Sequence, residues 1–144
     1  MLKDKPRLLA VLNRVAKEAG WGLPMEEGRG RGISLQESFG SIVGQVVEVT
    51  VSGGKTWVDR VVAVIDAGYA VSPDGMKAQI ESGIVYGLSA AMYGEITIEN
   101  GAVAQSRFAD YDAIRMHESP VIETPIIKSG AEIVGAAAPG RPGV

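Results

Sequence analysis

The side chains of this 144-residue chain that could carry out chemistry are few. His117 is the single histidine and cysteine is absent, so a Ser-His-Asp triad could be built only around His117. A zinc or iron site would lack both a thiolate and a second imidazole. His117 lies in the charged stretch 115–118, with no small-residue nucleophile motif beside it. We therefore interpret it as an exposed loop histidine and predict no catalytic residue and no metal ligand.

The carboxylates are the remaining acid–base candidates, but a catalytic pair has to be held across a cleft, which spacing alone does not show. We expect most of them to be surface or capping charges. Gln79 differs, because its amide offers donors and an acceptor on a helix face that glycines leave bare. From the residues alone, a binding role and a solvent-facing glutamine are both open. The carboxylates are Asp66, Glu81, Glu95, Asp110 and Asp112.

The element that must position Gln79 is a helix predicted over residues 73–93. Ser72 can cap it, Pro73 suits its first position, and Asp74 complements the positive end of the dipole. Interior glycines cost about 1 kcal/mol each relative to alanine, so we predict that some group approaches the backbone there. Apolar residues at helical spacing are Met76, Ile80, Ile84, Leu88 and Ala91, and a neighbouring strip holds Gln79, Gly83, Gly87 and Ala90.

The remaining pattern alternates short strands with a second helix. An amphipathic helix is predicted over residues 6–19, with Leu8, Leu12, Val15 and Ala19 on its buried face, Asp4 as cap and Gly20 as left-handed stop. Predicted strands are 33–37, a hairpin of 44–51 and 57–65 around a glycine turn, a hairpin at residues 95–105 around Asn100-Gly101, and an edge strand at 121–127 interrupted by Pro125. A loop with one helical turn is predicted at 110–117.

The glycine- and arginine-rich stretch 28–32 superficially resembles a phosphate loop. Such a loop lies between a strand and a helix, whereas here a predicted strand follows. We interpret residues 21–32 as a connecting loop whose arginines act as anchors.

The composition excludes several function classes. Lys and Arg number 14 against 17 Asp and Glu, a net charge of −3, so we expect no nucleic-acid partner. The longest apolar stretch, 84–93, is shorter than the roughly 20 residues that span a bilayer, and the N-terminus is too polar for a signal peptide. We expect no membrane association and a cytoplasmic location.

Six short motifs in fixed order resemble the xanthine dehydrogenase/aldehyde oxidase family of molybdopterin enzymes, with particular similarity to large subunits of the isoquinoline 1-oxidoreductase type. The similarity extends from Pro6 to about Pro139, and the succession is more specific than any single motif. The motifs are Gly30-Arg-Gly-Ile33, Glu37-Ser-Phe-Gly40, Val61-Val-Ala-Val-Ile-Asp-Ala-Gly68, Val71-Ser-Pro-Asp74, Gln79-Ile-Glu-Ser-Gly-Ile-Val-Tyr-Gly-Leu88 and Tyr93-Gly-Glu95.

The resemblance implies an α+β two-layer sandwich, in which helices pack on an antiparallel or mixed sheet as in molybdenum-cofactor-binding domains. We expect residues 1–130 to form this partial domain and residues 131–144 to form a disordered tail. The implied cofactor is molybdopterin, often a cytosine dinucleotide, in the complete enzyme rather than on this chain alone. The glutamine of the Gln-x-Glu-x-Gly motif lies near it in the family, which suggests Gln79 and Gly83 as cofactor-binding residues, and the helix start at Ser72 and Gly75 could receive a phosphate.

The resemblance also implies that an essential group is missing. The family places a catalytic glutamate in a Val-Gly-Glu-Pro-Gly-like motif, where this chain has Val134-Gly-Ala-Ala-Ala-Pro-Gly140 and Ala138 at the glutamate position. Two hypotheses follow. The chain is either a C-terminal segment of an aldehyde or N-heterocycle hydroxylase, completed by the rest of the large subunit and an iron–sulfur subunit, or a catalytically silent homologue that acts as a fold or association module. Surface left exposed by the missing part predicts a homo-oligomer.

Overall fold

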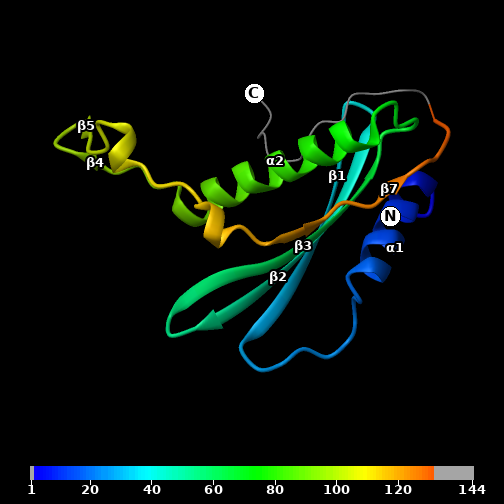
Figure 1. The fold of residues 1–144 in the computed structure, drawn as a ribbon, viewed down its shortest axis with the longest axis horizontal. Coiled ribbons are helices and arrows are strands. Elements are labelled where there is room, and N and C mark those ends of the chain that lie inside the picture. The colour runs from blue at the N-terminus through cyan, green and yellow to red at the C-terminus, as the bar shows by residue number, and fades with distance from the viewer. Residues whose placement is uncertain (1, 132–144) are drawn as a thin grey trace.

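Three antiparallel strands form the centre of the computed structural model, which describes residues 2–131 (Figure 1). The strands are β1 (Arg29–Ser38), β2 (Ser41–Ser52) and β3 (Lys55–Asp66). Both connections are two-residue turns with positive φ, 49° and 78° at Phe39-Gly40 and 56° and 74° at Gly53-Gly54. Turns of this hand match the twist of paired strands, so the predicted glycine turn is confirmed and a second hairpin precedes it.

The last strand lies at the sheet edge, as its proline predicts. Two short pieces, β6 (Val121–Glu123) and β7 (Ile126–Ile127), run parallel to β3. Pro125 separates them, and its carbonyl accepts a hydrogen bond of 3.2 Å from the Ile65 amide. The main sheet therefore has the order β1-β2-β3-β6, with β7 also on β3 and β1 at the opposite edge.

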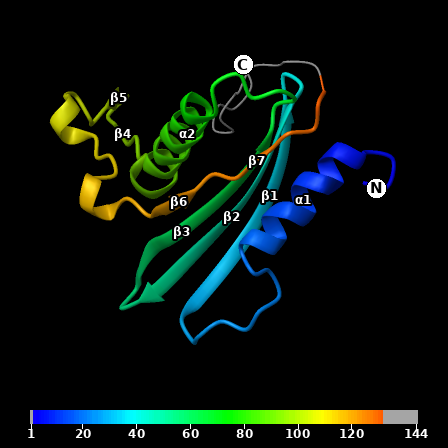
Figure 2. The same ribbon diagram turned by 45° about the vertical axis from the view of Figure 1, so that its right-hand side comes forward.

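A helix covers each face of the sheet, because successive strand residues point to opposite faces. Helix α1 (Pro6–Glu18) packs on Ile42, Val46, Val62 and Val64, whereas α2 (Pro73–Tyr93) packs on Val43, Val61, Ala63 and Ile65. Figure 2 shows the two helices on opposite sides of the strands. This arrangement confirms the α+β class with packed helices and a mixed sheet.

The details of α1 differ from the prediction at two points. Its N-cap is Lys5 without a side-chain bond, so Asp4 does not cap it; Gly20, at φ 61°, does follow its end. Val11 is fully buried and Leu12 only half-buried. The sheet packs against the stripe Leu8, Val11, Val15 and Ala19, whereas the prediction had Leu12 in place of Val11.

Residues 29–32 are strand, not loop. Pairing continues from Ile33 back to Arg29, which lies opposite Thr50. Glycine, which occupies two of these four positions, has weak strand propensity. However, β2 offers a partner along its whole length, and this tertiary pairing decides the local structure.

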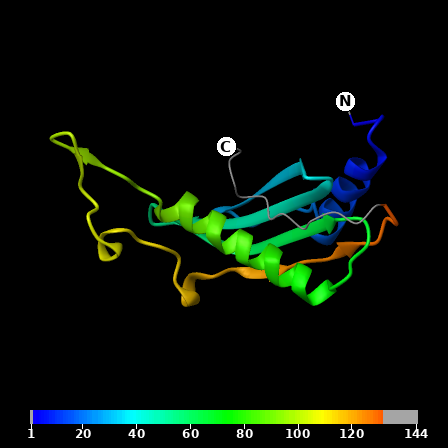
Figure 3. The same ribbon diagram turned by 90° about the horizontal axis from the view of Figure 1, so that it is seen from above.

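An extended arm of residues 94–119 leaves the end of α2 and reaches away from the sheet (Figures 1 and 3). It holds the hairpin of β4 (Ile98–Glu99) and β5 (Ala102–Val103), shorter than predicted, and the single 3₁₀ turns η1 (Phe108–Asp110) and η2 (Met116–Glu118). Ile98, Phe108 and Met116 are exposed. The expected C-terminal tail and Ala138 lie, apart from Ala131, outside the described residues.

Gly44 of β2 allows α1 to approach the sheet. A Cβ built there would lie 3.0 Å from Val11 Cγ1 and 3.1 Å from Val15 Cγ1. Gly44→Val should therefore lower the free energy of unfolding by about 2 kcal/mol through overpacking. Gly32→Val is the control, since a Cβ at Gly32 meets no atom within 4 Å; urea denaturation of both variants tests this, and equal losses would contradict it.

Candidate functional site

The predicted site residues all lie on α2 or its cap. Ser72 is the N-cap, and its Oγ accepts a hydrogen bond of 3.4 Å from the Gly75 amide. A Cβ at Gly75 would lie 3.0 Å from that Oγ, so glycine keeps the cap compact. The predicted capping role of Ser72 and the helix end at Tyr93 are confirmed.

One strip of α2 is bare of large side chains. Spacing of four residues places Gly75, Gln79, Gly83 and Gly87 along one stripe of the helix, beside the stripe of Met76, Ile80, Ile84 and Leu88 that packs on the sheet. Gly83 and Gly87 are half-buried, and a Cβ at Gly87 would meet nothing within 4 Å. The strip is therefore open at Gly87 within the described chain rather than filled by its own core.

Gln79 is exposed, and its amide has no hydrogen-bond partner among residues 2–131. It lies on the same stripe as Gly87, about two helical turns away, with donors and an acceptor available. The structure thus brings Ser72 and Gly75 into contact and places Gln79 and Gly83 in line with them along α2.

The backbone amides in the first turn of α2 already have part of their hydrogen-bonding capacity used. The cap uses the Gly75 amide, and Asp74 adds a carboxylate to the same turn. A phosphate here would compete with both, so the phosphate role of Ser72 and Gly75 stays a prediction.

Most of the remaining acid–base candidates are capping or surface charges. Asp110 accepts from the amides of Ser106 and Arg107 at 3.2 Å, as expected for a capping charge. Asp112 forms an exposed ion pair with Arg115, and His117 is exposed. Glu81 and Glu95 are exposed as well.

Asp66 is the exception, because it is 1% exposed. It accepts hydrogen bonds from Arg7 Nε at 3.0 Å, Ser129 Oγ at 2.6 Å and the Gly68 amide at 2.9 Å. Burial alone would raise the pKa of Asp66, but these three donors and the Arg7 charge hold it below its ordinary value. The Asp-x-Gly motif is thus a structural tie of β3 to α1 and to the segment after β7.

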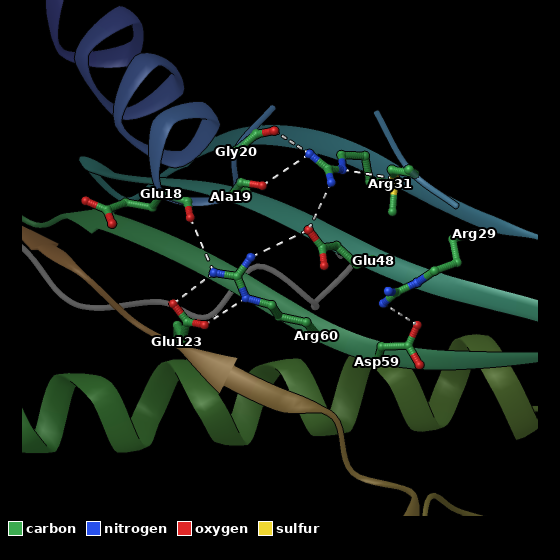
Figure 4. Close-up of polar contacts among 10 residues, drawn as sticks. Glu18, Ala19, Gly20, Arg29, Arg31, Glu48, Asp59, Arg60 and Glu123 are labelled. Atoms are coloured by element: carbon green, nitrogen blue, oxygen red, sulfur yellow. Dashed lines mark hydrogen bonds and ion pairs between the residues drawn. The ribbon is translucent and has the colours of Figure 1, made fainter. Parts of the chain in front are cut away.

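A network of ion pairs fastens the end of α1 to the sheet (Figure 4). Glu48 lies 3.6 Å from Arg31 Nη2 and 3.5 Å from Arg60 Nη1. Arg31 donates to the carbonyls of Ala19 and Gly20, and Arg60 donates to that of Glu18. Arg31 is therefore the anchor that its sequence context suggests, although it lies in a strand.

Arg60 also forms a two-pronged contact with Glu123 of β6. The distances are 2.7 Å from Nε to Oε1 and 3.1 Å from Nη2 to Oε2. This hydrogen bonding lowers the pKa of Glu123 and raises that of Arg60. The same arginine thus joins β3 to α1, β2 and β6.

A cleft of about 420 Å³ lies at the other end of α2 from Ser72, and sequence reasoning missed it. Tyr93 Oη donates to Glu118 Oε1 at 2.5 Å there, which raises the pKa of Tyr93 and lowers that of Glu118. Twenty-five residues separate the pair, so no spacing rule could find it. The cleft is lined by Lys55, Thr56, Trp57, Val58, Met92, Tyr93, Ile114 and Glu118.

Among residues 2–131, no three His, Cys, Asp or Glu side chains gather as a metal site. No described helix is long and apolar enough to cross a membrane.

Comparison with known proteins gives the fold and the family. The chain is 30% identical over 141 residues to isoquinoline 1-oxidoreductase subunit beta of Brevundimonas diminuta, covering 94% of this chain and 18% of that protein. Its fold matches quinoline 2-oxidoreductase from Pseudomonas putida 86 (TM-score 0.55, 22% identity) and Cu,Mo-CO dehydrogenase (TM-score 0.54, 24% identity). These matches cover 68% and 67% of this chain and 13% of each of the two structures.

The chain thus spans less than a fifth of the length of the relatives it matches. A model of the molybdopterin cofactor-binding domain matches residues 15–120, from within α1 to the end of the arm. The sequence motifs, the fold and this match agree. The chain belongs to the molybdopterin cofactor-binding domain family.

Proposed function

We propose that this chain supplies one wall of a molybdopterin cleft in a larger hydroxylase large subunit, through the open strip of α2, and is inactive alone. The observation that carries the proposal is the open backbone at Gly87, on the same stripe of α2 as Gln79, whose exposed amide has no hydrogen-bond partner among residues 2–131. A helix interior retains glycine at a cost of about 1 kcal/mol relative to alanine. A bulky group lying against the helix gives a reason for that cost.

The residues present fit such a group. Gly87 leaves room at the backbone, because a Cβ there would meet no described atom within 4 Å, and the Gln79 amide can donate to and accept from a pterin edge. When bound, the cofactor supplies the redox chemistry by which the family hydroxylates aldehydes or N-heterocycles. This chain's residues would hold and orient it, while the base that takes the proton has to come from other polypeptide, because alanine occupies position 138.

Two further features support the proposal that this chain is a segment of a larger assembly. The outer side of α2 and the arm expose apolar side chains, among them Tyr86, Ile98 and Phe108, which further polypeptide of a larger subunit would cover. The relatives are also more than five times longer than the stretch they share with this chain. We propose the remainder of the large subunit and an iron–sulfur subunit as partners, and a cytoplasmic location.

Gly87→Leu separates cofactor binding from folding. In the chain alone, it should raise the free energy of unfolding by up to about 1 kcal/mol, because glycine leaves a helix interior and no described atom lies within 4 Å of the new Cβ. In the complex with the flanking large-subunit polypeptide, it should reduce bound molybdenum and pterin at least tenfold. Thermal or urea unfolding measures the first effect, and elemental analysis with pterin fluorescence measures the second.

Ala78→Leu is the matched control, since Ala78 is exposed on the opposite side of α2. It should leave cofactor content unchanged. Equal cofactor content in the Gly87 and Ala78 variants would contradict the role of the strip, and a complex that never holds molybdenum or pterin would overturn the whole proposal.

A further inference from the structure

Helix α2 connects β3 to β6, and its two flanks face different strands. On one flank, Ser89 Oγ accepts a hydrogen bond of 3.2 Å from the Ile114 amide, in the segment that leads into β6. Ser89 follows the sheet-facing Leu88 by one residue and Gly87 precedes it by one, so the two lie on opposite flanks, because successive helical residues are about 100° apart. The glycine strip therefore faces away from β6, toward β2 and β1 (Figure 3).

The side of β1 that faces α2 is uncovered. Ile33 and Leu35 pack on the cluster under α1, so the alternate residues of β1 point to the α2 side of the sheet. Gly32, Ser34 and Gln36 are on that side and are exposed, and no residue of β1 belongs to the described apolar cluster under α2. These three small or polar residues form a shelf, the β1 shelf, beside the glycine strip.

Gln45 of β2 lies between the β1 shelf and the strand that α2 covers. It is paired with Ser34 of β1 and with Ala63 of β3. Val43 and Val47 pack in the cluster under α2, so the side chain of Gln45, which has the same parity, is on the α2 side as well. A glutamine thus stands where its strand otherwise places valine.

The amide of Gln45 is a donor without an acceptor in the described chain. Its Nε2 atom is buried and forms no hydrogen bond within residues 2–131. Most buried polar groups are hydrogen-bonded, and a buried donor without an acceptor lowers stability. Local conflicts of this kind are expected at functional sites, and the acceptor for Gln45 therefore belongs to a group outside this segment.

The position of Gln45 places this donor beside the glycine strip. Ala63, its neighbour on β3, packs in one cluster with Ile80 and Ile84, and Gly83 lies between these two along α2. A pterin presents a carbonyl oxygen and ring nitrogens as acceptors, which a lone amide donor requires. Building on the proposed function, we infer that Gln45 is a second cofactor-binding amide, which donates from Nε2 to a pterin held between the glycine strip and the β1 shelf.

Gln45→Met tests this role, because methionine keeps the length of the side chain and removes the amide. In the chain alone, the urea midpoint should stay equal or rise, since no hydrogen bond is lost and a buried polar group is removed. In the complex with the flanking large-subunit polypeptide, bound pterin should dissociate about fivefold faster on dilution, as expected for the loss of one hydrogen bond. Pterin fluorescence follows the release.

Gln105→Met is the matched control, because the Gln105 amide is satisfied within the arm. Its Nε2 donates to Thr97 Oγ1 and its Oε1 accepts from the Thr97 amide, each at 2.9 Å. This variant should leave pterin release unchanged. A lower urea midpoint for Gln45→Met would show that the amide has an acceptor within the chain, and equal pterin release in the two variants would show that water or other polypeptide accepts from it; either result would overturn the inference.

Gly87→Leu in the same complex separates this inference from the proposed function. Loss of cofactor in the Gly87 variant, with wild-type pterin release in Gln45→Met, would overturn the role of Gln45 alone. A complex that never holds molybdenum or pterin would overturn both.

Discussion

Glu48→Ala is expected to lower the free energy of unfolding by about 3 kcal/mol, the largest effect of a single substitution proposed for this chain. Glu48 is 8% exposed and lies between Arg31 and Arg60, whose side chains are 14% and 28% exposed. Removing one partner from a buried ion-pair network leaves uncompensated charge, typically at about 3–5 kcal/mol. We take the lower end because Arg60 keeps Glu123.

The loss should appear in urea denaturation at neutral pH as a lower midpoint with an unchanged slope. Arg14→Ala is the control: it removes an exposed ion pair on α1, and such pairs contribute about 0.5 kcal/mol or less. A loss below about 1 kcal/mol for Glu48→Ala would show that the two arginines rehydrate, and the network would then not be what holds the end of α1.

Asp66→Asn is expected to lower the free energy of unfolding at pH 7 by about 2 kcal/mol. The amide is nearly the same size, but the charge-assisted bond from Arg7 is lost, and hydrogen bonds to charged groups contribute about 1.5–3 kcal/mol. The Gly68 amide and Ser129 hydroxyl also lose a charged acceptor. Urea denaturation beside the wild type measures the difference.

The contribution of Asp66 to the free energy of unfolding should decrease as the pH falls. Because its pKa is lower in the folded chain than in the unfolded one, its ionised form stabilises the fold fully above about pH 4. That contribution is lost as the pH falls through the folded value. The stability curves of the wild type and of the Asp66→Asn variant should therefore converge in acid; curves that stay parallel down to about pH 2 would contradict the assignment. Glu123 is present in both proteins, so its own acid titration cancels in the comparison.

These substitutions distinguish residues that stabilise the fold from residues proposed to bind the cofactor; the sequence motifs contain both kinds. Asp66, in the Asp-x-Gly motif, ties β3 to α1 and is predicted to act on stability. Gln79 and Gly87, in the glutamine- and glycine-bearing motif, have no such partners in the described chain and are predicted to act on cofactor content. The first group can be tested on the chain alone, whereas the second requires the assembled subunit.

Much of the local structure follows from nearest-neighbour chemistry. Ser72-Pro73 begins α2, and Gly53-Gly54 and Asn100-Gly101 form turns with positive φ, because cap and turn preferences act within a few residues. The edge position of the strand around Pro125 is confirmed for a similar reason, since proline lacks the amide that a central strand would use. The family also follows from the sequence, because the order of six motifs is read without any structure.

Other features depend on residues far apart in the chain, and spacing could not give them. Arg29 to Gly32 become strand only because β2 offers a partner, and Val11 rather than Leu12 is buried because of where the sheet lies under α1. The network around Glu48 and the contact of Tyr93 with Glu118 each join separate elements.

The sequence by itself determined the family, the α2 helix with its cap and glycine-bearing stripe, and the turns, since each rests on contacts within a few residues or on a fixed order of motifs. Only the tertiary structure decided which arginines anchor α1, that Asp66 is a buried tie, and that β1 lies at one edge of the main sheet. Burial and strand pairing depend on contacts between segments that are distant in the sequence. They therefore stabilise the fold only once those segments have packed together.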